Sequence, residues 1–347
     1  MSAKRAEGRR RGMTGFELYL KRNSAAFGRY LDTFFEDGLH PDMERYLYGM
    51  IREFTAGGGK RHRPLICLLA CEAVGGDPEL ARGAAAAIEH FHTAALIHDD
   101  IEDCSLTRRD QPCVHVVEGV GLAINAGDLA LSLVTGTVVR DQGLDDATKL
   151  RVLGELIDMT TRTIEGQALD IGWARDERFD LTVGDYLVMA NHKTAYYSGA
   201  VPLAVGAIIG GGADEQIAAL RRFGMAAGLA FQVQDDVLNL VGRKEAVKKD
   251  FRSDVTEGKR TLVAIHALEN SPERERLLGI LAAHTDDPAL LAEAVSIMER
   301  GGSIEFAKAY GRDLILEAKE GLASSLPATR ARRLLLEMAD FFVQRSS

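Results

Sequence analysis

Apolar residues recur at helical spacing along most of the chain. Leu47, Met50, Ile51 and Phe54 follow the i, i+3, i+4, i+7 pattern of one helix face, and the glycines at 57–59 end that helix. The same periodicity continues in two further stripes, made of Leu150, Leu153, Ile157, Ile164, Ala168 and Ile171, and of Leu334, Met338 and Phe341. The pattern predicts an all-α protein.

Few segments suggest any other structure. Val114–Val117 could form a short strand, but no set of alternating segments predicts a sheet. Residues 1–13 are rich in arginine and predict a disordered basic arm. Residues 14–347 contain no repeat, linker or low-complexity stretch, which predicts a single large helical bundle domain.

One apolar stretch bears on the membrane question. Residues 194–213 are uncharged over about the length that crosses a bilayer. Because Pro202 and a glycine run at 210–212 interrupt it, we expect a helix that is buried on all sides and ends at the glycines, with no membrane span.

The four cysteines suit a reducing compartment. Cys67 and Cys71 lie four apart in an apolar run, so we expect both to face the core from one helix. Their number and spacing fit neither a disulfide scaffold nor a zinc finger, which favours a cytoplasmic location.

Charge narrows the choice of partners. The 347 residues include 42 Lys and Arg against 51 Asp and Glu, a formal net charge of −9. Basic residues gather in the first twelve positions, so the body of the protein is more acidic than the whole chain. A nucleic acid partner is therefore not expected.

Acidic residues cluster at the ends of two apolar segments. Asp99, Asp100 and Asp103 lie within one helical turn, where their mutual repulsion and the helix dipole each cost a few tenths to about 1 kcal/mol. Asp235 and Asp236 end a second apolar helix in the same way. Carboxylates grouped like this suit Mg²⁺, which binds a few carboxylates together with substrate phosphates.

Basic residues near both clusters predict anion pockets. Lys60 and Arg63 lie one turn apart after a glycine-rich turn, and Arg108 and Arg109 follow the first cluster. Lys193, Lys249 and Lys259 come later in the chain. Each alone fits an exposed salt bridge, but together with the acids they predict two diphosphate pockets around a metal cluster.

In this order and spacing the motifs resemble those of trans-isoprenyl diphosphate synthases, and most of all geranylgeranyl diphosphate synthases. The resemblance covers residues 20–340 and includes the segments at 59–64, 99–109, 166–170, 193–194, 232–236 and 257–261. Three positions depart from the family pattern. Asn239 replaces a third aspartate, and Asp110 and Arg252 stand where glycine is usual.

The resemblance implies a helical bundle with a central cavity in which three Mg²⁺ ions bridge an allylic diphosphate to both acidic motifs. It implies these metal ligands: Asp99, Asp103 and Asp235. Asp100 and Asp236 would orient metal-bound water, and Lys193 completes the catalytic set. The allylic diphosphate would be held by Arg108, Lys193, Thr194, Gln232, Lys249 and Lys259. Isopentenyl diphosphate would be held by Lys60, Arg63, His92 and Arg109.

Product length should be set on the helix that leads to Asp99. One turn back lies Ala95 and one turn deeper lies Phe91. The small side chains of Ala94 and Ala95 leave room for a growing chain, and Phe91 could form the floor. This arrangement predicts a C20 product, with C15 or longer chains as alternatives.

Two other functions fit less well. A class I terpene cyclase would not need a second diphosphate pocket, which Lys60, Arg63 and Arg109 predict. A non-catalytic partner subunit could lose metal ligands, yet five of the six acidic positions are present. The resemblance also implies a homodimer, and the apolar helix at 121–134 is a plausible interface element.

Overall fold

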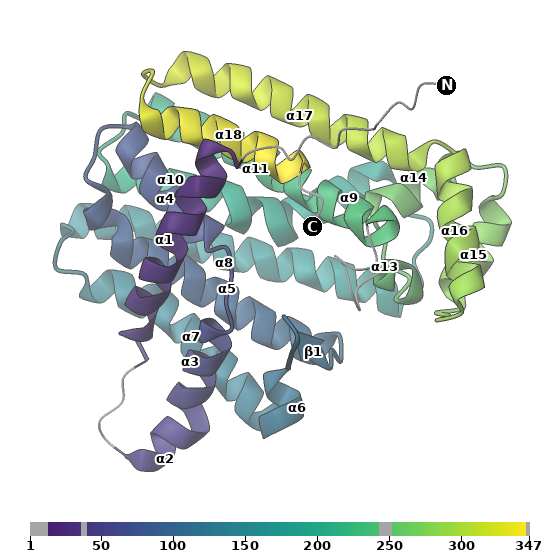
Figure 1. Ribbon diagram of the computed structural model, residues 1–347, viewed down its shortest axis with the longest axis horizontal. Helices are drawn as coiled ribbons and strands as arrows, with labels where there is room; N and C mark the ends of the chain where they lie inside the picture. The colour runs from purple at the N-terminus through teal and green to yellow at the C-terminus, as the bar shows by residue number, and fades with distance from the viewer. Residues whose placement is uncertain (1–12, 36–39, 243–251, 345–347) are drawn as a thin grey trace, which may run out of the picture.

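The computed structural model describes residues 13–35, 40–242 and 252–344 (Figure 1). Almost all of the described chain is helical, which confirms the predicted all-α class. Most of the predicted basic arm lies outside the described residues. The first helix begins at Gly15, where the hydroxyl of Thr14 and the carboxylate of Glu17 form a capping box.

The elements, in chain order, are α1 (Gly15–Asp32), α2 (Pro41–Met43), η1 (Glu44–Tyr48), α3 (Gly49–Ala56), α4 (His62–Ala73), η2 (Pro78–Ala81), α5 (Arg82–Glu102), β1 (Thr107–Arg108), β2 (Gln111–Pro112), α6 (Val114–Glu118), α7 (Val120–Arg140), α8 (Asp146–Arg175), α9 (Val183–Ala190), η3 (Asn191–Ala200), α10 (Val201–Ile209), α11 (Asp214–Val241), α13 (Ser253–Thr256), α14 (Leu262–Asn270), α15 (Arg274–Ala282), α16 (Pro288–Arg300), α17 (Ser303–Ser325) and α18 (Arg330–Gln344). η1 and η3 are π-helical, and η2 is a 3₁₀ turn.

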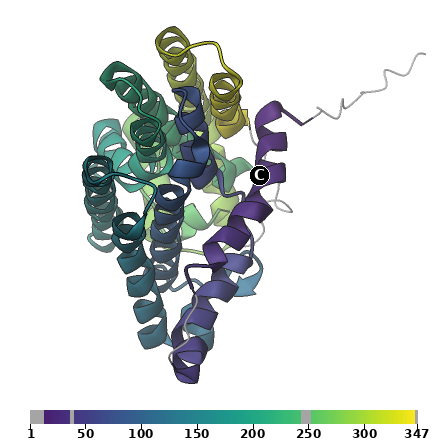
Figure 2. The same ribbon diagram turned by 90° about the vertical axis from the view of Figure 1, so that its left-hand side faces the viewer.

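Long helices surround a buried centre. α10 contacts α4, α8 and α11, while α5 packs along α7 and α11 packs along both η3 and α17. The views in Figures 1 and 2 show α17 and α18 covering one side of this bundle, with α15 and α16 at one end. The helices α5 and α11 are therefore each packed against several other helices.

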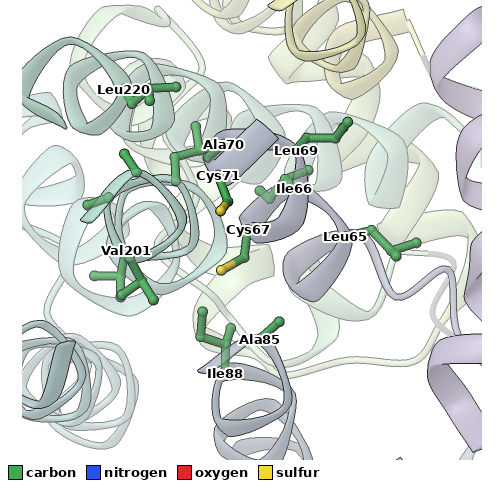
Figure 3. Packing of buried hydrophobic residues seen from close by; sticks show 14 of the residues in the cluster. Leu65, Ile66, Cys67, Leu69, Ala70, Cys71, Ala85, Ile88, Val201 and Leu220 are labelled. Carbon is green, nitrogen blue, oxygen red and sulfur yellow. The ribbon is translucent and has the colours of Figure 1, made fainter. Parts of the chain in front are cut away.

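The core between α4, α5 and α10 is built from small and branched side chains (Figure 3). Cys67 and Cys71 are buried there, as predicted, and burial raises the pKa of the Cys71 thiol to about 11. Gly206 permits close packing, since a Cβ at that position would lie 2.0 Å from the carbonyl oxygen of Cys67.

Two sequence predictions need correction or refinement. Val114–Val117 lies in helix α6, so the predicted strand is wrong; the two short strands are Thr107–Arg108 and Gln111–Pro112. The run of valines lacks a strand partner, and Val116 and Val117 face outward. On α8 the predicted stripe exists, but Leu150, Ile157, Ile164 and Ile171 are exposed. The core-facing residues of that helix are others, namely Val152, Leu156, Met159, Thr163 and Gly166.

The apolar stretch at 194–213 is buried as predicted in its second half, whereas its first half belongs to η3, where Tyr196 and Tyr197 are only partly buried. α10 is buried throughout Val201–Ile208, and it ends at Gly210. Among the described residues, one helix, Val120–Arg140, is long and apolar enough to cross a membrane by length and composition, and 39% of its most apolar window is buried in the protein.

A buried histidine gives the fold a pH dependence. His90 lies between the rings of Phe34 and Phe35, and burial lowers its pKa to about 3. The folded state keeps the His90 ring neutral, whereas in the unfolded chain the same ring binds a proton below about pH 6.5. Acid therefore favours the unfolded state, and the stability that His90 contributes is lost as the pH falls. Between pH 7 and pH 5 this should lower the free energy of unfolding by about 2 kcal/mol. In urea titrations at both pH values, the free energy of unfolding of His90→Leu should not show this decrease. If it depends on pH as strongly as that of the native protein, His90 is not the cause of the pH dependence.

Candidate active site

The first acidic motif lies in the last turn and C-cap of α5, and the second lies within α11, which continues to Val241, so the helix end predicted at Asp235 and Asp236 is wrong. The two helices frame two adjoining cavities. The larger cavity, of about 670 Å³, contains Phe91, His92, Asp99, Arg109, Tyr197 and Asp235 in its wall. The smaller, of about 360 Å³, contains Asp170, Tyr186, Asp236, Asp254 and Lys259. Lys193, Gln232 and Asp235 line both, so the cavities share one polar mouth.

The first motif has an exposed and a buried side. Asp100 is 1% exposed and accepts a 2.7 Å hydrogen bond from Nε of Arg108, whose Nη2 lies 3.1 Å from Asp99. Burial raises the pKa of Asp100, against the lowering effect of Arg108. Asp99 lines the larger cavity and accepts a 3.3 Å hydrogen bond from Gln167. Asp103 caps the helix end, and its carboxylate lies 3.8 Å from Nζ of Lys259.

The second motif is arranged in a similar way. Asp236 is 4% exposed and accepts hydrogen bonds from the hydroxyl of Tyr186 at 2.7 Å and the amide of Gln232 at 2.8 Å. Burial raises the pKa of Asp236, and it raises that of the neighbouring Asp254 as well. Asp235 lies at the mouth that both cavities share.

Two lysines beside the acidic motifs have raised pKa values; Lys193 lines both cavities and Lys259 lines the smaller one. Burial alone would lower the pKa of Lys259, but the carboxylates of Asp254, Asp103 and Glu257 raise it overall. The pKa of Lys193 is raised by its ion pair with Asp170, again against burial. Both ammonium groups are thus held near the acidic motifs, ready to contact an anion.

A second group of basic residues lies along the larger cavity. Arg63 donates to Ser198 at 2.9 Å and to the hydroxyl of Tyr197 at 2.9 Å, and its Nη1 lies 3.1 Å from Nε2 of His92. Burial, with the charge of Arg63, holds the pKa of His92 well below its usual range, so the ring is neutral.

The remaining predicted residues lie at the edges of this group. Arg109 lines the larger cavity and donates to the carbonyl of Gly58. Lys60 lies over the ring of Phe341, with Nζ 5.4 Å from its centre. Thr194 donates to Gln232 at 2.7 Å. Lys249 lies outside the described residues.

The residues expected to set product length are also on α5. Ala95 and Phe91 are part of the wall of the larger cavity, and Phe91 is 3% exposed, with its ring 5.6 Å from that of Tyr197. Ala94 is fully buried. Leu131 of α7 and Ile164 of α8 add apolar surface to the same wall.

The described chain matches known proteins over most of its length. The polyprenyl synthetase family model matches residues 44–298. The chain belongs to the polyprenyl synthetase family. It is 45% identical over 290 residues to a short chain isoprenyl diphosphate synthase of Methanothermobacter thermautotrophicus, covering 83% of this chain and 87% of that protein. Such relatives establish that the protein is a prenyltransferase.

Solved structures agree with this assignment. A geranylgeranyl pyrophosphate synthetase from Pyrococcus horikoshii superposes with a TM-score of 0.87 at 34% identity, over 95% of this chain and 98% of that one. A geranylgeranyl pyrophosphate synthase from Corynebacterium glutamicum, solved with isoprenyl diphosphate and magnesium, gives 0.83 at 29% identity over 95% and 98%.

The three departures from the family pattern have local explanations. Asp110 and Arg252 have φ of 65° and 64°, the left-handed region that glycine adopts most easily, so the backbone conformation is kept although the residue differs. Asn239 joins α11 to α13, because its amide donates to Ser253 at 3.0 Å and accepts from the backbone N–H of Asp254 at 3.3 Å.

Several residues of the site carried no signal in the sequence. Tyr186 lies in an apolar helix, fifty residues from the Asp236 that it contacts. Ser198 and Tyr197, which hold Arg63, lie in η3. A buried tyrosine hydroxyl needs a partner, which was the one available clue for Tyr186.

The π-helix η3 carries Lys193 and Thr194 and is held by glycine contacts. A Cβ on Gly166 would lie 2.2 Å from the backbone nitrogen of Lys193, so α8 can approach η3 this closely only with glycine. Gly166→Ala should displace Lys193 and lower kcat about 10- to 100-fold. On α17, Gly321→Ala meets nothing within 4 Å and serves as the control. Steady-state rates that match for the two variants would contradict this account.

Proposed function

We propose that the chain condenses isopentenyl diphosphate with an allylic diphosphate and makes mainly all-trans geranylgeranyl diphosphate, the C20 product. One observation carries the proposal. Two adjoining cavities share a mouth that has carboxylate and lysine side chains, and the larger one also contains a second basic group and apolar side chains in its wall. Relatives named geranylgeranyl diphosphate synthase support the C20 length.

The acidic residues fit Mg²⁺. Their donor atoms are all oxygens, and Asp236 and Asp254 are buried carboxyl groups whose charge a divalent cation would stabilise. Within the described ranges no three His, Cys, Asp or Glu side chains alone form a metal site. Asp99, Asp103 and Asp235 would thus be ligands beside water and diphosphate oxygens. Bound metal supplies Lewis-acid stabilisation of the leaving diphosphate; the number of ions, three by resemblance, stays a prediction.

The allylic diphosphate is held at the shared mouth. Lys193, Lys259 and Arg108 stabilise negative charge on the diphosphate as its allylic C–O bond breaks. Thr194 and Gln232 orient it by hydrogen bonds. Asp100 keeps Arg108 in place and Asp236 fixes Gln232, so the buried acids also act through these neighbours.

Isopentenyl diphosphate binds on Arg63, His92, Arg109 and Lys60. Because an arginine side chain can only donate hydrogen bonds, Nε2 of His92 accepts from Arg63, and the neutral ring carries its hydrogen on Nδ1. Nδ1 is buried and has no hydrogen-bond partner in the described part of the chain. Through Nε2 the ring orients Arg63, which lines the cavity. The double bond of isopentenyl diphosphate then attacks the allylic cation, and a proton passes to the released diphosphate. The apolar wall keeps water from the cation.

Product analysis tests the proposal. The purified protein is incubated with Mg²⁺, labelled isopentenyl diphosphate and, in turn, C5, C10 and C15 allylic diphosphates, and the products are dephosphorylated and separated by chain length. We expect C20 from each starter. A cyclised hydrocarbon, or no incorporation of label, would contradict the proposed reaction, and C15 or C25 would contradict the length. Relatives named geranylfarnesyl diphosphate synthase make C25 the main alternative.

We also propose that the protein acts as a homodimer. Leu150 and Ile157 on α8 are 71% and 55% exposed and lie seven residues apart, a spacing suited to pairing with a second helix. α7 adds exposed Val120 and Ile124, in line with the interface expected at 121–134. Sedimentation should give a dimer for the native chain and a monomer for Leu150→Glu with Ile157→Glu. Leu316→Glu, at a 63% exposed position on α17, is the control. A monomeric native chain would refute the proposal.

The absence of disulfides among the four cysteines supports a cytoplasmic location. The four cysteines are free, and Cys67, Cys71 and Cys113 are buried. We therefore place the enzyme in a reducing compartment.

A further inference from the structure

A buried arginine lies in the middle of the turn that carries the isopentenyl diphosphate ligands. Arg61 follows Lys60 and precedes Arg63 by two residues, yet it is only 7% exposed. Its φ of 49° places it in the left-handed region, and Gly58 and Gly59 just before it also have positive φ. The backbone conformation turns the Arg61 side chain into the protein, while Arg63 lines the cavity.

The guanidinium of Arg61 joins two helices. Its Nη1 lies 2.5 Å from Oε1 of Glu89 on α5, and its Nη2 donates to the carbonyl of Thr55 in the last turn of α3. Glu89 is 3% exposed. The turn also contacts α1, where the hydroxyl oxygen of Ser24 lies 2.8 Å from the carbonyl oxygen of Lys60 and 2.7 Å from that of Leu20. Its single hydrogen is donated to one of these carbonyls at a time.

Stability alone does not explain this arrangement. A buried ion pair loses hydration on both partners, and well-packed apolar residues of similar size often stabilise a fold equally well. A left-handed conformation at a residue with a side chain adds a further cost. What the pair does provide is a fixed geometry, because a planar guanidinium with two partners permits one orientation of the turn.

The orientation of this turn affects the position of every residue in the second basic group. Arg109 donates to the carbonyl of Gly58, so its side chain is held by the same turn. His92 lies three residues after Glu89 and shares its side of α5. Arg63 is in the first turn of α4, which begins directly after Arg61. A change in the orientation of Arg61 would therefore move all of them together.

We infer that Arg61 and Glu89 are positioning residues for isopentenyl diphosphate. Their buried ion pair directs Lys60, Arg63 and Arg109 toward one diphosphate group. The inference rests on the proposed function. Neither residue needs to touch substrate. In the described part of the chain, the pair has no hydrogen bond or ion pair with a residue assigned to the allylic diphosphate. Its loss should therefore affect one substrate and spare the other.

The test separates the two substrates kinetically. Glu89→Gln leaves a buried unpaired charge and risks misfolding, so the main variant is the double replacement Arg61→Met with Glu89→Leu, which keeps the site packed and apolar. We expect the KM for isopentenyl diphosphate to rise about tenfold or more, with the KM for the allylic diphosphate within about twofold of native. Thermal unfolding confirms that the variant is folded.

A matched pair provides the control. Arg221 and Glu155 join α11 to α8 through two 2.6 Å contacts, remote in sequence from the turn. Arg221→Met with Glu155→Leu should leave the KM for isopentenyl diphosphate unchanged. A folded Arg61–Glu89 double variant with a native KM for isopentenyl diphosphate, or with both KM values raised equally, would overturn the inference. Native enzyme that does not use isopentenyl diphosphate would instead contradict the proposed function.

Discussion

Replacing Asp99 with asparagine should lower kcat/KM about 10³-fold or more. The side chain lies at the end of α5, faces the larger cavity and is held by Arg108 and Gln167. Asparagine keeps the shape but removes the negative charge that attracts Mg²⁺ and leaves one poor ligand oxygen. Without that ligand the leaving diphosphate is not neutralised as the C–O bond breaks. Asp235→Asn should have a similar effect from the opposite helix.

The rate is measured as incorporation of labelled isopentenyl diphosphate over a range of Mg²⁺ concentrations. Asp214→Asn is the control, because this carboxylate also lies on α11, its side chain is 92% exposed and it pairs with Arg151 outside both cavities. Its activity should remain within about twofold of native, as for most surface substitutions. Asp99→Asn with more than a tenth of native activity would show that this carboxylate does not bind the catalytic metal.

Changing Ala95 to phenylalanine should shorten the main product from C20 to C15 or C10. Ala95 lies one turn before Asp99 in the cavity wall, so a large ring there would occupy the space that the third and fourth isoprene units need. Phe91→Ala should have the opposite effect, because Phe91 lies one turn deeper and closes the cavity against Tyr197. The expected product is then C25 or longer.

Chromatography of the dephosphorylated products measures both changes. Total incorporation of isopentenyl diphosphate shows that each variant remains an active enzyme, so a shift in length is distinct from a loss of rate. If Ala95→Phe still makes C20, the growing chain does not pass this residue, and the floor must be sought elsewhere, for example at Leu131 or Ile164.

Helices and acidic motifs were predictable because their signals are local. Apolar periodicity predicts helices within a few turns, and the carboxylates of both motifs lie on such helices, near the end of α5 and within α11. The glycines at 57–59 and 210–212 mark helix ends that the structure confirms. The order of the motifs was specific enough to indicate the family, which the comparisons then showed.

What the sequence did not predict depends on contacts between distant residues. Arg61 contacts Glu89 across 28 positions, and nothing in a basic turn indicates that one of its arginines points inward. The exposed face of α8 has the same periodicity as a core face, because helical spacing does not tell which side is covered. The π-helical hydrogen bonding of η3 also leaves no periodic signature in a ten-residue segment.

The central claim is that both acidic motifs bind one diphosphate through metal while the second basic group binds another. A crystal structure of the protein with Mg²⁺, a non-ionisable thiolodiphosphate analogue of the allylic substrate and isopentenyl diphosphate tests this most directly. The account predicts metal density between the analogue and the carboxylates of Asp99, Asp103 and Asp235, with isopentenyl diphosphate on Arg63, His92 and Arg109. Metal bound away from these carboxylates, or both diphosphates bound at a single group of basic residues, would contradict it.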